Sequence, residues 1–241
     1  MYLENLVFDA AQPQVLGHFW EQALGTQTLT DEPDIVETRL SVDGGPTLDL
    51  CFQQVTDPLL PAPRLHLDLH AGADQAGTVE RLIGLGATHL DIGQGDVPWV
   101  VLADPEGHPF CVMEERETYR DTGPIAAVPI LGDDPKRDAA FWAELTGWRE
   151  YAGSAPQSLR HPSGRGPILE FLRAERERPK TGKNQLHLDL RLEAQDDLAA
   201  LIDHVEGLGA VRIDHDWGDL PWTSLQDPSG NEFCFLPSRS Q

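Results

Sequence analysis

Cysteine is scarce in this sequence of 241 residues. The three that occur form no CxxC pair, and they are Cys51, Cys111 and Cys234. An odd number of isolated cysteines argues against a disulfide framework and favours a reducing compartment such as the cytoplasm. No apolar run approaches the roughly 18–20 residues of a membrane span. The first residues contain neither a basic segment nor a long apolar one, so we expect no signal peptide.

Basic residues are also few. Lysine and arginine number 18 against 40 aspartates and glutamates, which gives a formal net charge of −22. Such a surface repels phosphate groups, so this composition argues against nucleic-acid and anionic-membrane partners. The acidic residues are dispersed rather than gathered in blocks, and the simplest interpretation of the charge is solubility.

The sequence does contain an internal repeat. Leu65-His66-Leu67-Asp68-Leu69 returns 121 residues later as Leu186-His187-Leu188-Asp189-Leu190. Other segments return 121 to 123 residues later, among them Phe19-Trp20, Pro98-Trp99 and Asp104-Pro105. A nearly constant offset over the whole length indicates a duplication with small changes in the loops. The repeat predicts two domains, residues 1–120 and 124–241, which the chain joins as an internal pseudo-dimer.

Strict alternation of leucine with polar residues predicts half-buried strands. The leucines would face a packed layer, and His66, Asp68, His187 and Asp189 would face the other way. Residues two apart on a strand are usually too far apart for a direct hydrogen bond. We therefore expect these side chains to line a pocket, with a catalytic base as the less favoured alternative.

The remaining pattern predicts four similar units, two per half, each a strand, a helix and three further strands. In the first half, we expect a strand over residues 3–9, a helix over 13–24 and strands over 35–42 and 47–53. Proline at the start of the helix and Gly25 after its end are typical helix boundaries. The fold class is α+β.

Several motifs resemble the glyoxalase/bleomycin-resistance/extradiol-dioxygenase superfamily, also called vicinal oxygen chelate. They are Phe19-Trp20-x-x-x-Leu24-Gly25, Leu48-x-Leu50, His66 at the start of a strand, and Asp104-Pro105-Glu106-Gly107-x-x-Phe110-Cys111. Their order is met in both halves. The resemblance implies paired βαβββ units whose strands curl into two tandem cups, with helices outside and the binding site within each cup.

The resemblance also implies four metal ligands per cup in metal-dependent members, two of them usually histidine and two glutamate. Carried over within each half, the first cup would present Asn5, Asp49, His66 and Cys111, and the second would present Ala127, Glu170, His187 and Cys234. Each set departs from the pattern at two positions. Asp49, His66 and Cys111, or Glu170, His187 and Cys234, are the candidate metal ligands, whether for zinc, iron, nickel or manganese. The alternative is that each cysteine is a small buried hydrophobic residue and that no cofactor binds.

The tryptophans occur in matched pairs. Trp20 and Trp142 lie on apolar helix stripes and are predicted to be core residues. Trp99 and Trp222 each follow a proline at the predicted cup rim, where they would stack on a flat ligand or pack under a loop. Asp104 and Asp227 are predicted to be turn residues.

The favoured function is a cytoplasmic, metal-free protein that binds a small molecule, of the sequestering or resistance type implied by the resemblance. The predicted ligand-binding residues are His66, Asp68, Trp99, His187, Asp189 and Trp222. The alternative is a metal-dependent lyase, isomerase or dioxygenase. A third possibility is a structural or regulatory protein with no pocket. Enzymatic activity and the choice between a monomer and a homodimer stay open.

Overall fold

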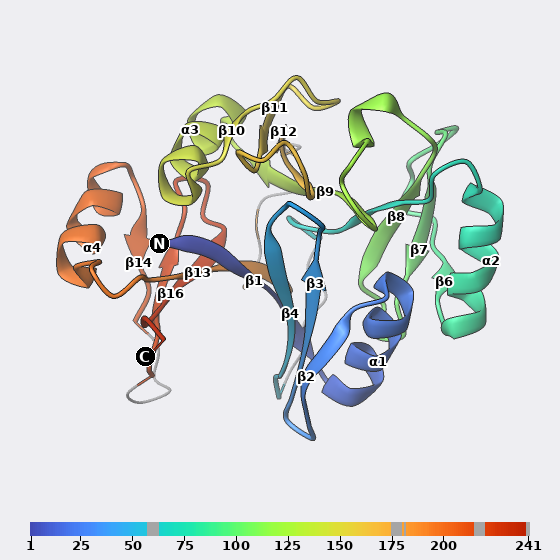
Figure 1. Cartoon of the computed structure of the whole chain (residues 1–241), viewed down its shortest axis with the longest axis horizontal. Coiled ribbons are helices and arrows are strands. Elements are labelled where there is room, and N and C mark those ends of the chain that lie inside the picture. The colour runs from blue at the N-terminus through green and yellow to red at the C-terminus, as the bar shows by residue number, and fades with distance from the viewer. Residues whose placement is uncertain (57–62, 175–179, 181, 215–219, 240–241) are drawn as a thin grey trace.

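The computed structural model describes residues 1–56, 63–174, 180, 182–214 and 220–239. Within these ranges the chain forms four units that each contain a strand, a helix and three strands (Figure 1). The first unit is β1 (Tyr2–Ala10), α1 (Pro13–Leu24), β2 (Gln27–Glu32), β3 (Ile35–Ser41) and β4 (Thr47–Gln54). The second is β5 (Asp68–His70), α2 (Gln75–Leu85), β6 (Thr88–His89), β7 (Val100–Ala103) and β8 (Pro109–Met113).

A linker with a 3₁₀ turn, Glu117–Tyr119, leads into the second half. The third unit is β9 (Ile125–Gly132), α3 (Pro135–Thr146), β10 (Arg149–Glu150), β11 (Gln157–Arg160) and β12 (Ile168–Arg173). The fourth is β13 (Leu186–Arg191), α4 (Leu198–Gly207), β14 (Val211–Arg212), β15 (Thr223–Gln226) and β16 (Glu232–Leu236). The α+β fold and the tandem βαβββ units predicted from the sequence are confirmed.

Two eight-stranded sheets contain these strands, and each sheet takes four strands from each half of the chain. The first sheet has the order β14-β15-β16-β13-β1-β4-β3-β2, and the second has the order β10-β11-β12-β9-β5-β8-β7-β6. The halves meet where β1 pairs antiparallel with β13 and where β5 pairs antiparallel with β9. The sequence-based expectation that each half builds its own cup is therefore wrong. Units one and four share one sheet, and units two and three share the other.

The apolar faces of both sheets pack into one core together with the helices. Leu65, Leu67 and Leu69 lie in this core, as do their counterparts Leu186, Leu188 and Leu190. Because successive strand residues point to opposite faces, the polar residues between these leucines point away from the core. The predicted alternation is thus confirmed in both copies, although β5 itself covers only Asp68–His70.

One buried hydrogen bond occurs in both halves and ties a helix to a distant turn. The indole Nε1 of Trp20 donates to Asp104 Oδ2 at 3.1 Å, and that of Trp142 donates to Asp227 Oδ2 at 3.2 Å. Each aspartate also accepts backbone N–H groups of its own turn. The core role of the tryptophans and the turn role of the aspartates are both confirmed.

The sequence analysis did not identify β2. This edge strand is mostly exposed and polar, so it has no buried face that would produce a hydrophobic period. Among the described helices, none combines the length and the apolar composition that a bilayer crossing requires.

The two halves differ at the residue that follows each Asp-Pro-x-Gly turn. In the first half, His108 Nδ1 lies 3.0 Å from Asp104 Oδ2, whereas Asn231 Nδ2 donates to Asp227 Oδ2 in the second. Burial lowers the pKa of His108, but the Asp104 carboxylate, together with Glu106 and Asp9, raises it by more, so the pKa lies above its ordinary value. The protonated imidazole is therefore stabilised in the folded protein.

We expect His108→Asn to make the first half resemble the second and to remove this pH-dependent contribution. A raised folded-state pKa stabilises the protein below the ordinary histidine pKa of about 6.5 and loses that effect as the pH rises through the folded-state value. The free energy of unfolding of the wild type should exceed that of the variant by roughly 1–2 kcal/mol at low pH and by less at high pH. Urea denaturation at pH 5.5 and pH 9 measures the difference. A difference independent of pH would contradict this account.

Candidate functional site

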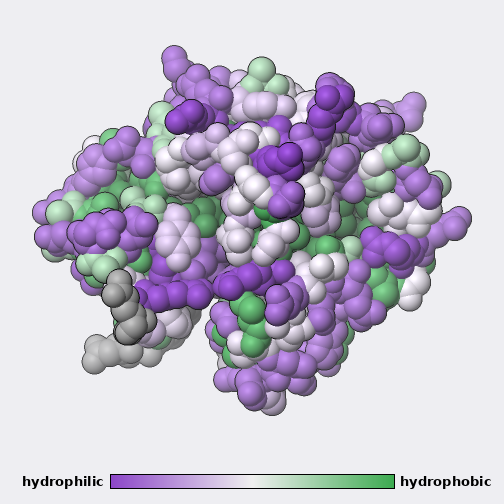
Figure 2. Space-filling model, viewed as in Figure 1, coloured by the Kyte–Doolittle hydropathy of each residue, from purple (hydrophilic) through white to green (hydrophobic). Residues whose placement is uncertain are grey.

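The outer face of each sheet, opposite the core, carries a set of polar side chains. We call the outer face of the first sheet the first cup, and that of the second sheet the second cup. In the view of Figure 2, a hollow bordered by hydrophilic residues separates the part with β13–β16 from the part with β2–β4. This hollow is the opening of the first cup.

The sheet order regroups the predicted site residues. Asp49 lies in the first cup with His187, Asp189 and Cys234, and Glu170 lies in the second cup with His66 and others. The second-cup residues from the prediction are His66, Asp68, Cys111 and Glu170. The acid that was assigned to each cup from the sequence therefore belongs to the other one. The reason is that β4 pairs with β1 in the sheet to which the second half contributes His187. Likewise, β12 pairs with β9 in the sheet to which the first half contributes His66.

Each cup contains a cluster of an imidazole, a carboxylate and a thiol. The donor atoms of His66, Asp68 and Cys111 lie within 4.8 Å of one another, and those of the second-half cluster do the same. The second-half cluster is His187, Asp189 and Cys234. Parallel pairing of β5 with β8 places Asp68 beside Cys111, so the thiol of the cluster comes from a different strand than the carboxylate.

Each histidine lies closer to its aspartate than the sequence analysis expected. His66 Nε2 is 3.3 Å from Asp68 Oδ1, and His187 Nε2 is 3.4 Å from Asp189 Oδ1. Strand side chains lean along the strand, which lets a long imidazole approach a residue two positions away. These nitrogen and oxygen atoms are nevertheless not aligned for a hydrogen bond. Both Oδ1 atoms lack a hydrogen-bond partner among the described residues.

The cysteines are buried and remain neutral. Burial raises the pKa of the Cys111 and Cys234 thiols far above the ordinary range, and the nearby aspartates raise it further. Cys51, which the sequence analysis did not assign to a site, also faces the first cup, beside Val7 and in the same row of the sheet as His187. Its pKa is raised by burial as well.

A shift in strand register makes the two cups different. In the first sheet, Asp49 pairs with Asn5 on one side and with Arg39 on the other. The corresponding Glu170 pairs with Pro129 and Ser158, although Ala127 and Arg160 are the counterparts of Asn5 and Arg39. Strand β12 is therefore displaced by two residues. A shift of two keeps every side chain on its original face, so Glu170 still points into the cup.

This displacement also brings Glu170 level with the histidine of the second cup. Leu65 pairs with Ile130 and Asp68 pairs with Ala127, which places His66 opposite Pro129. Glu170 adjoins Pro129 from the other side. Glu170 and His66 thus lie on one row of the sheet, one strand apart.

Arginine side chains form ion pairs with two acids of the first cup, Asp49 and Glu4. Arg39 binds Asp49 through two hydrogen bonds of 2.7 Å, and Arg239 lies 3.8 Å from the same carboxylate. Glu4, on the same strand as Asn5, is paired with Arg191 and with Arg239. Asp49 and Glu4 are therefore both engaged in charge-assisted contacts with guanidinium groups.

Glu170 in the second cup forms no ion pair with an arginine among the residues that the structure describes. Burial and, to a smaller extent, the neighbouring Asp68 raise its pKa to about 7, although a backbone N–H of Ser154, Arg116 and His66 oppose the shift. Its Oε1 atom has no hydrogen-bond partner in the described part of the chain, and neither has Ser158 Oγ beside it. The second cup thus combines a carboxyl group poised near neutrality with unsatisfied polar atoms.

Aromatic residues form the walls of the second cup. Tyr119, from the linker between the halves, is completely buried and packs with Cys111, Ala127 and neighbours. The cluster includes Val101, Met113, Ala126, Ile168, Trp99 and Tyr151. Arg116 lies 5.9 Å from the centre of the Trp99 ring and 5.5 Å from that of Tyr119. Trp99 therefore lies at the second cup, where it contacts an arginine.

Tyr119, Arg116, Ser158 and Arg160 were missed by the sequence analysis. The repeat could have pointed to Arg116 and Arg160, because they correspond to Arg239 and Arg39 at the offsets of the repeat. Tyr119 had none, since it lies in the linker and has no counterpart. Trp222 lies partly buried just before β15, and no described contact links it to the first-cup cluster.

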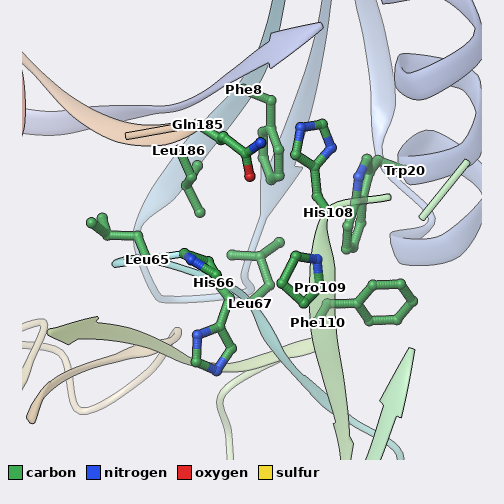
Figure 3. A pocket seen from close by; sticks show the side chains of 11 residues that line it. Phe8, Trp20, Leu65, His66, Leu67, His108, Pro109, Phe110, Gln185 and Leu186 are labelled. Carbon is green, nitrogen blue, oxygen red and sulfur yellow. The ribbon is translucent and has the colours of Figure 1, made fainter. Parts of the chain in front are cut away.

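A small cavity lies between the two sheets and not in either cup (Figure 3). Its volume is about 10 Å³, which is close to the space of a single water molecule. Leu65, Leu67 and His108 are among its lining residues. The imidazole of His66 extends away from this cavity, on the other side of its strand from Leu65 and Leu67 (Figure 3). The cavity is therefore not a ligand site.

Comparison with known proteins identifies a family and a fold. A family model described as a glyoxalase-like domain matches residues 5–113 and again residues 129–236. Glyoxalase I from Zea mays has a similar structure, with a TM-score of 0.63 and 14% sequence identity, covering 98% of this chain and 92% of that one. A putative dioxygenase from Bacillus subtilis subsp. subtilis str. 168 is also similar, with a TM-score of 0.62 and 14% sequence identity. The match covers 100% of this chain and 86% of that one. At these identities the likeness concerns the fold alone. A comparison with curated proteins gave no match.

Replacing Asp49 or Glu170 by its neutral amide should have opposite effects on the stability of the protein. Asp49→Asn leaves Arg39 without its carboxylate and should destabilise the protein by roughly 2 kcal/mol. Glu170 has a raised pKa, so the wild type loses stability as the pH rises from about 4.5 to above about 7. Glu170→Gln should remove that loss and become progressively more stable than the wild type over this range.

Guanidinium denaturation at pH 5 and pH 8, with a chelator present, tests both expectations. Asp189 in the first cup also has a pKa raised to about 7 by burial, so only differences from the wild type are informative. Equal destabilisation by the two substitutions at pH 8 would contradict the difference between the cups.

Proposed function

We propose that this chain, which belongs to the glyoxalase-like domain family, binds a small molecule in its second cup, between His66 and Glu170. The observation that supports this most is a group of buried polar atoms without partners that share one face. They are Asp68 Oδ1, Glu170 Oε1 and Ser158 Oγ, within the described residues. Buried polar atoms in folded proteins are nearly always hydrogen-bonded, so such a group suits a ligand with complementary polar atoms.

The surroundings of these atoms also suit a ligand. Trp99, Tyr151 and Tyr119 supply apolar and aromatic walls, and binding sites typically combine such walls with few polar groups. Burial raises the pKa of Tyr119 to about 12, so its hydroxyl stays protonated and can donate a hydrogen bond. The second cup is favoured over the first because the first-cup carboxylates Asp49 and Glu4 already bind arginines.

Glu170 gives the site a means of proton exchange with what it binds. With a pKa of about 7 it is present in both forms near neutral pH, so it can accept a proton from a ligand or donate one. Binding alone is enough for sequestration. Turnover would require the ligand's reacting atom to lie within hydrogen-bond reach of this carboxyl group.

A second candidate is metal-dependent chemistry, which the donor geometry favours. His66, Asp68 and Cys111 provide nitrogen, oxygen and sulfur within 4.8 Å, and Asp68 Oδ1 has no hydrogen-bond partner in the described ranges. This donor set fits zinc, for which three protein ligands leave one position for a substrate or water. When bound, such an ion polarises an oxygen of the ligand. Glu170, one strand from His66, would then hold or move the proton.

A ligand screen followed by two matched variants tests the binding proposal. Compounds are ranked by thermal stabilisation and tryptophan quenching, and hits are repeated with His66→Gln and His187→Gln. We expect the hits to lose their effect in the first variant, which alters the second cup, and to keep it in the second. Loss of binding only in His187→Gln would assign the site to the first cup and refute the proposal.

Elemental analysis of protein purified without chelator tests the metal candidate. One bound metal per chain, lost in Cys111→Ser and retained in Cys234→Ser, would support an ion in the second cup. The wild type would also be stabilised by the added ion. Metal content no higher than that of chelator-treated protein would count against this candidate.

A further inference from the structure

Arg160, at the end of β11, is buried in the second cup without an acidic partner. Its exposure is 7%, and it pairs with Ile168, a member of the second-cup cluster. Its Nη2 donates to the carbonyl of Arg120 at 2.5 Å, and its guanidinium lies 5.0 Å from the centre of the Tyr151 ring. Across the described ranges no carboxylate lies within ion-pair distance of this side chain, and its Nε has no hydrogen-bond partner.

The corresponding arginine of the first half shows which partner this position takes when one is available. Arg39 binds both oxygens of Asp49 at 2.7 Å. The two-residue displacement of β12 sets Ser158 beside Glu170 and leaves Arg160 beside Ile168. The same position in the repeat therefore holds a guanidinium with a carboxylate in one cup and a guanidinium without one in the other.

A buried charge without a counter-charge is unfavourable, because the interior replaces strongly solvating water with a medium of low dielectric constant. The planar guanidinium fork is well suited to the two oxygens of a carboxylate. Ser158, two residues earlier on the same face, contributes a hydroxyl that has no partner in the described chain. Tyr151 covers one face of the guanidinium and would also contact a flat molecule beside it.

We propose that Arg160 and Ser158 form an anion-binding subsite of the second cup, and that the small molecule bound there carries a carboxylate. This inference rests on the proposed binding function and specifies the class of ligand. The guanidinium is directed toward the linker carbonyl of Arg120, whereas Glu170 shares its row with His66. The carboxylate would bind at the Arg160 end, and the uncharged part of the molecule would extend toward Glu170 and His66.

Benzoate and benzamide are suitable probes because they have nearly the same shape and differ in charge. Thermal unfolding is followed against the concentration of each probe at constant ionic strength, with wild type, Arg160→Gln and the matched control Arg39→Gln. We expect benzoate to stabilise the wild type and Arg39→Gln more than benzamide does. Arg160→Gln should weaken the apparent affinity for benzoate about tenfold or more.

Arg160→Gln should fold, since it removes a buried charge that has no acidic partner, and Arg160→Lys serves as a second variant that keeps the charge without the fork. We expect the lysine variant to bind benzoate with intermediate affinity. Unchanged benzoate affinity in Arg160→Gln, or no stabilisation of the wild type by benzoate, would overturn the inference.

The variant His66→Gln separates this inference from the function on which it rests. If benzoate and benzamide bind equally and both lose affinity in His66→Gln, the second cup binds small molecules but the anion subsite is wrong. If neither probe binds and the wider ligand screen gives no hit that depends on His66, both proposals fail.

Discussion

The antiparallel pairings of β1 with β13 and of β5 with β9 hold the two halves of the chain together and define both cups. They join strands from different halves at the centre of each sheet, so neither half completes a cup alone. They also bring the two apolar sheet faces and the helices into one core. The polar residues that alternate with the core leucines then have to face outward, into the cups.

The repeat keeps the supports of the fold and varies the chemistry of the cups. Both halves retain a tryptophan that donates to the aspartate of a distant turn, and both retain the His-x-Asp strand beside a cysteine. The acids opposite these strands have diverged. Asp49 is bound by Arg39, whereas Glu170 faces Ser158 and has a pKa near 7. Two cups with the same framework therefore offer different sites.

A displacement of one strand by two residues accounts for this divergence. A shift of one residue would turn the polar face of β12 into the core, but a shift of two preserves both faces and only changes the neighbours. Glu170 loses the arginine that its counterpart has and becomes level with His66. Arg160 loses its acid in the same step. Within the described part of the chain, one change in register thus leaves an acid and a cation in the same cup without an ion-pair partner for either.

Local sequence signals were sufficient to predict the units, their order and the direction in which their side chains point. Periodicity and turn residues are local, so a repeat of 121 to 123 residues was enough to predict the βαβββ units, the core tryptophans and the outward face of His66, Asp68, His187 and Asp189. The polar edge strand β2 was missed because it buries no face.

Which residues share a cup could not be predicted from these signals, because it depends on long-range strand pairing. Asp49 shares a cup with His187 rather than with His66, because strand pairing joins segments more than a hundred residues apart and leaves no periodic trace in the sequence. The register of β12 is likewise set by packing between strands, since a shift of two is silent in the alternation of side chains. The pKa of Glu170 and the isolation of Arg160 follow from that register and from burial, and neither is encoded locally.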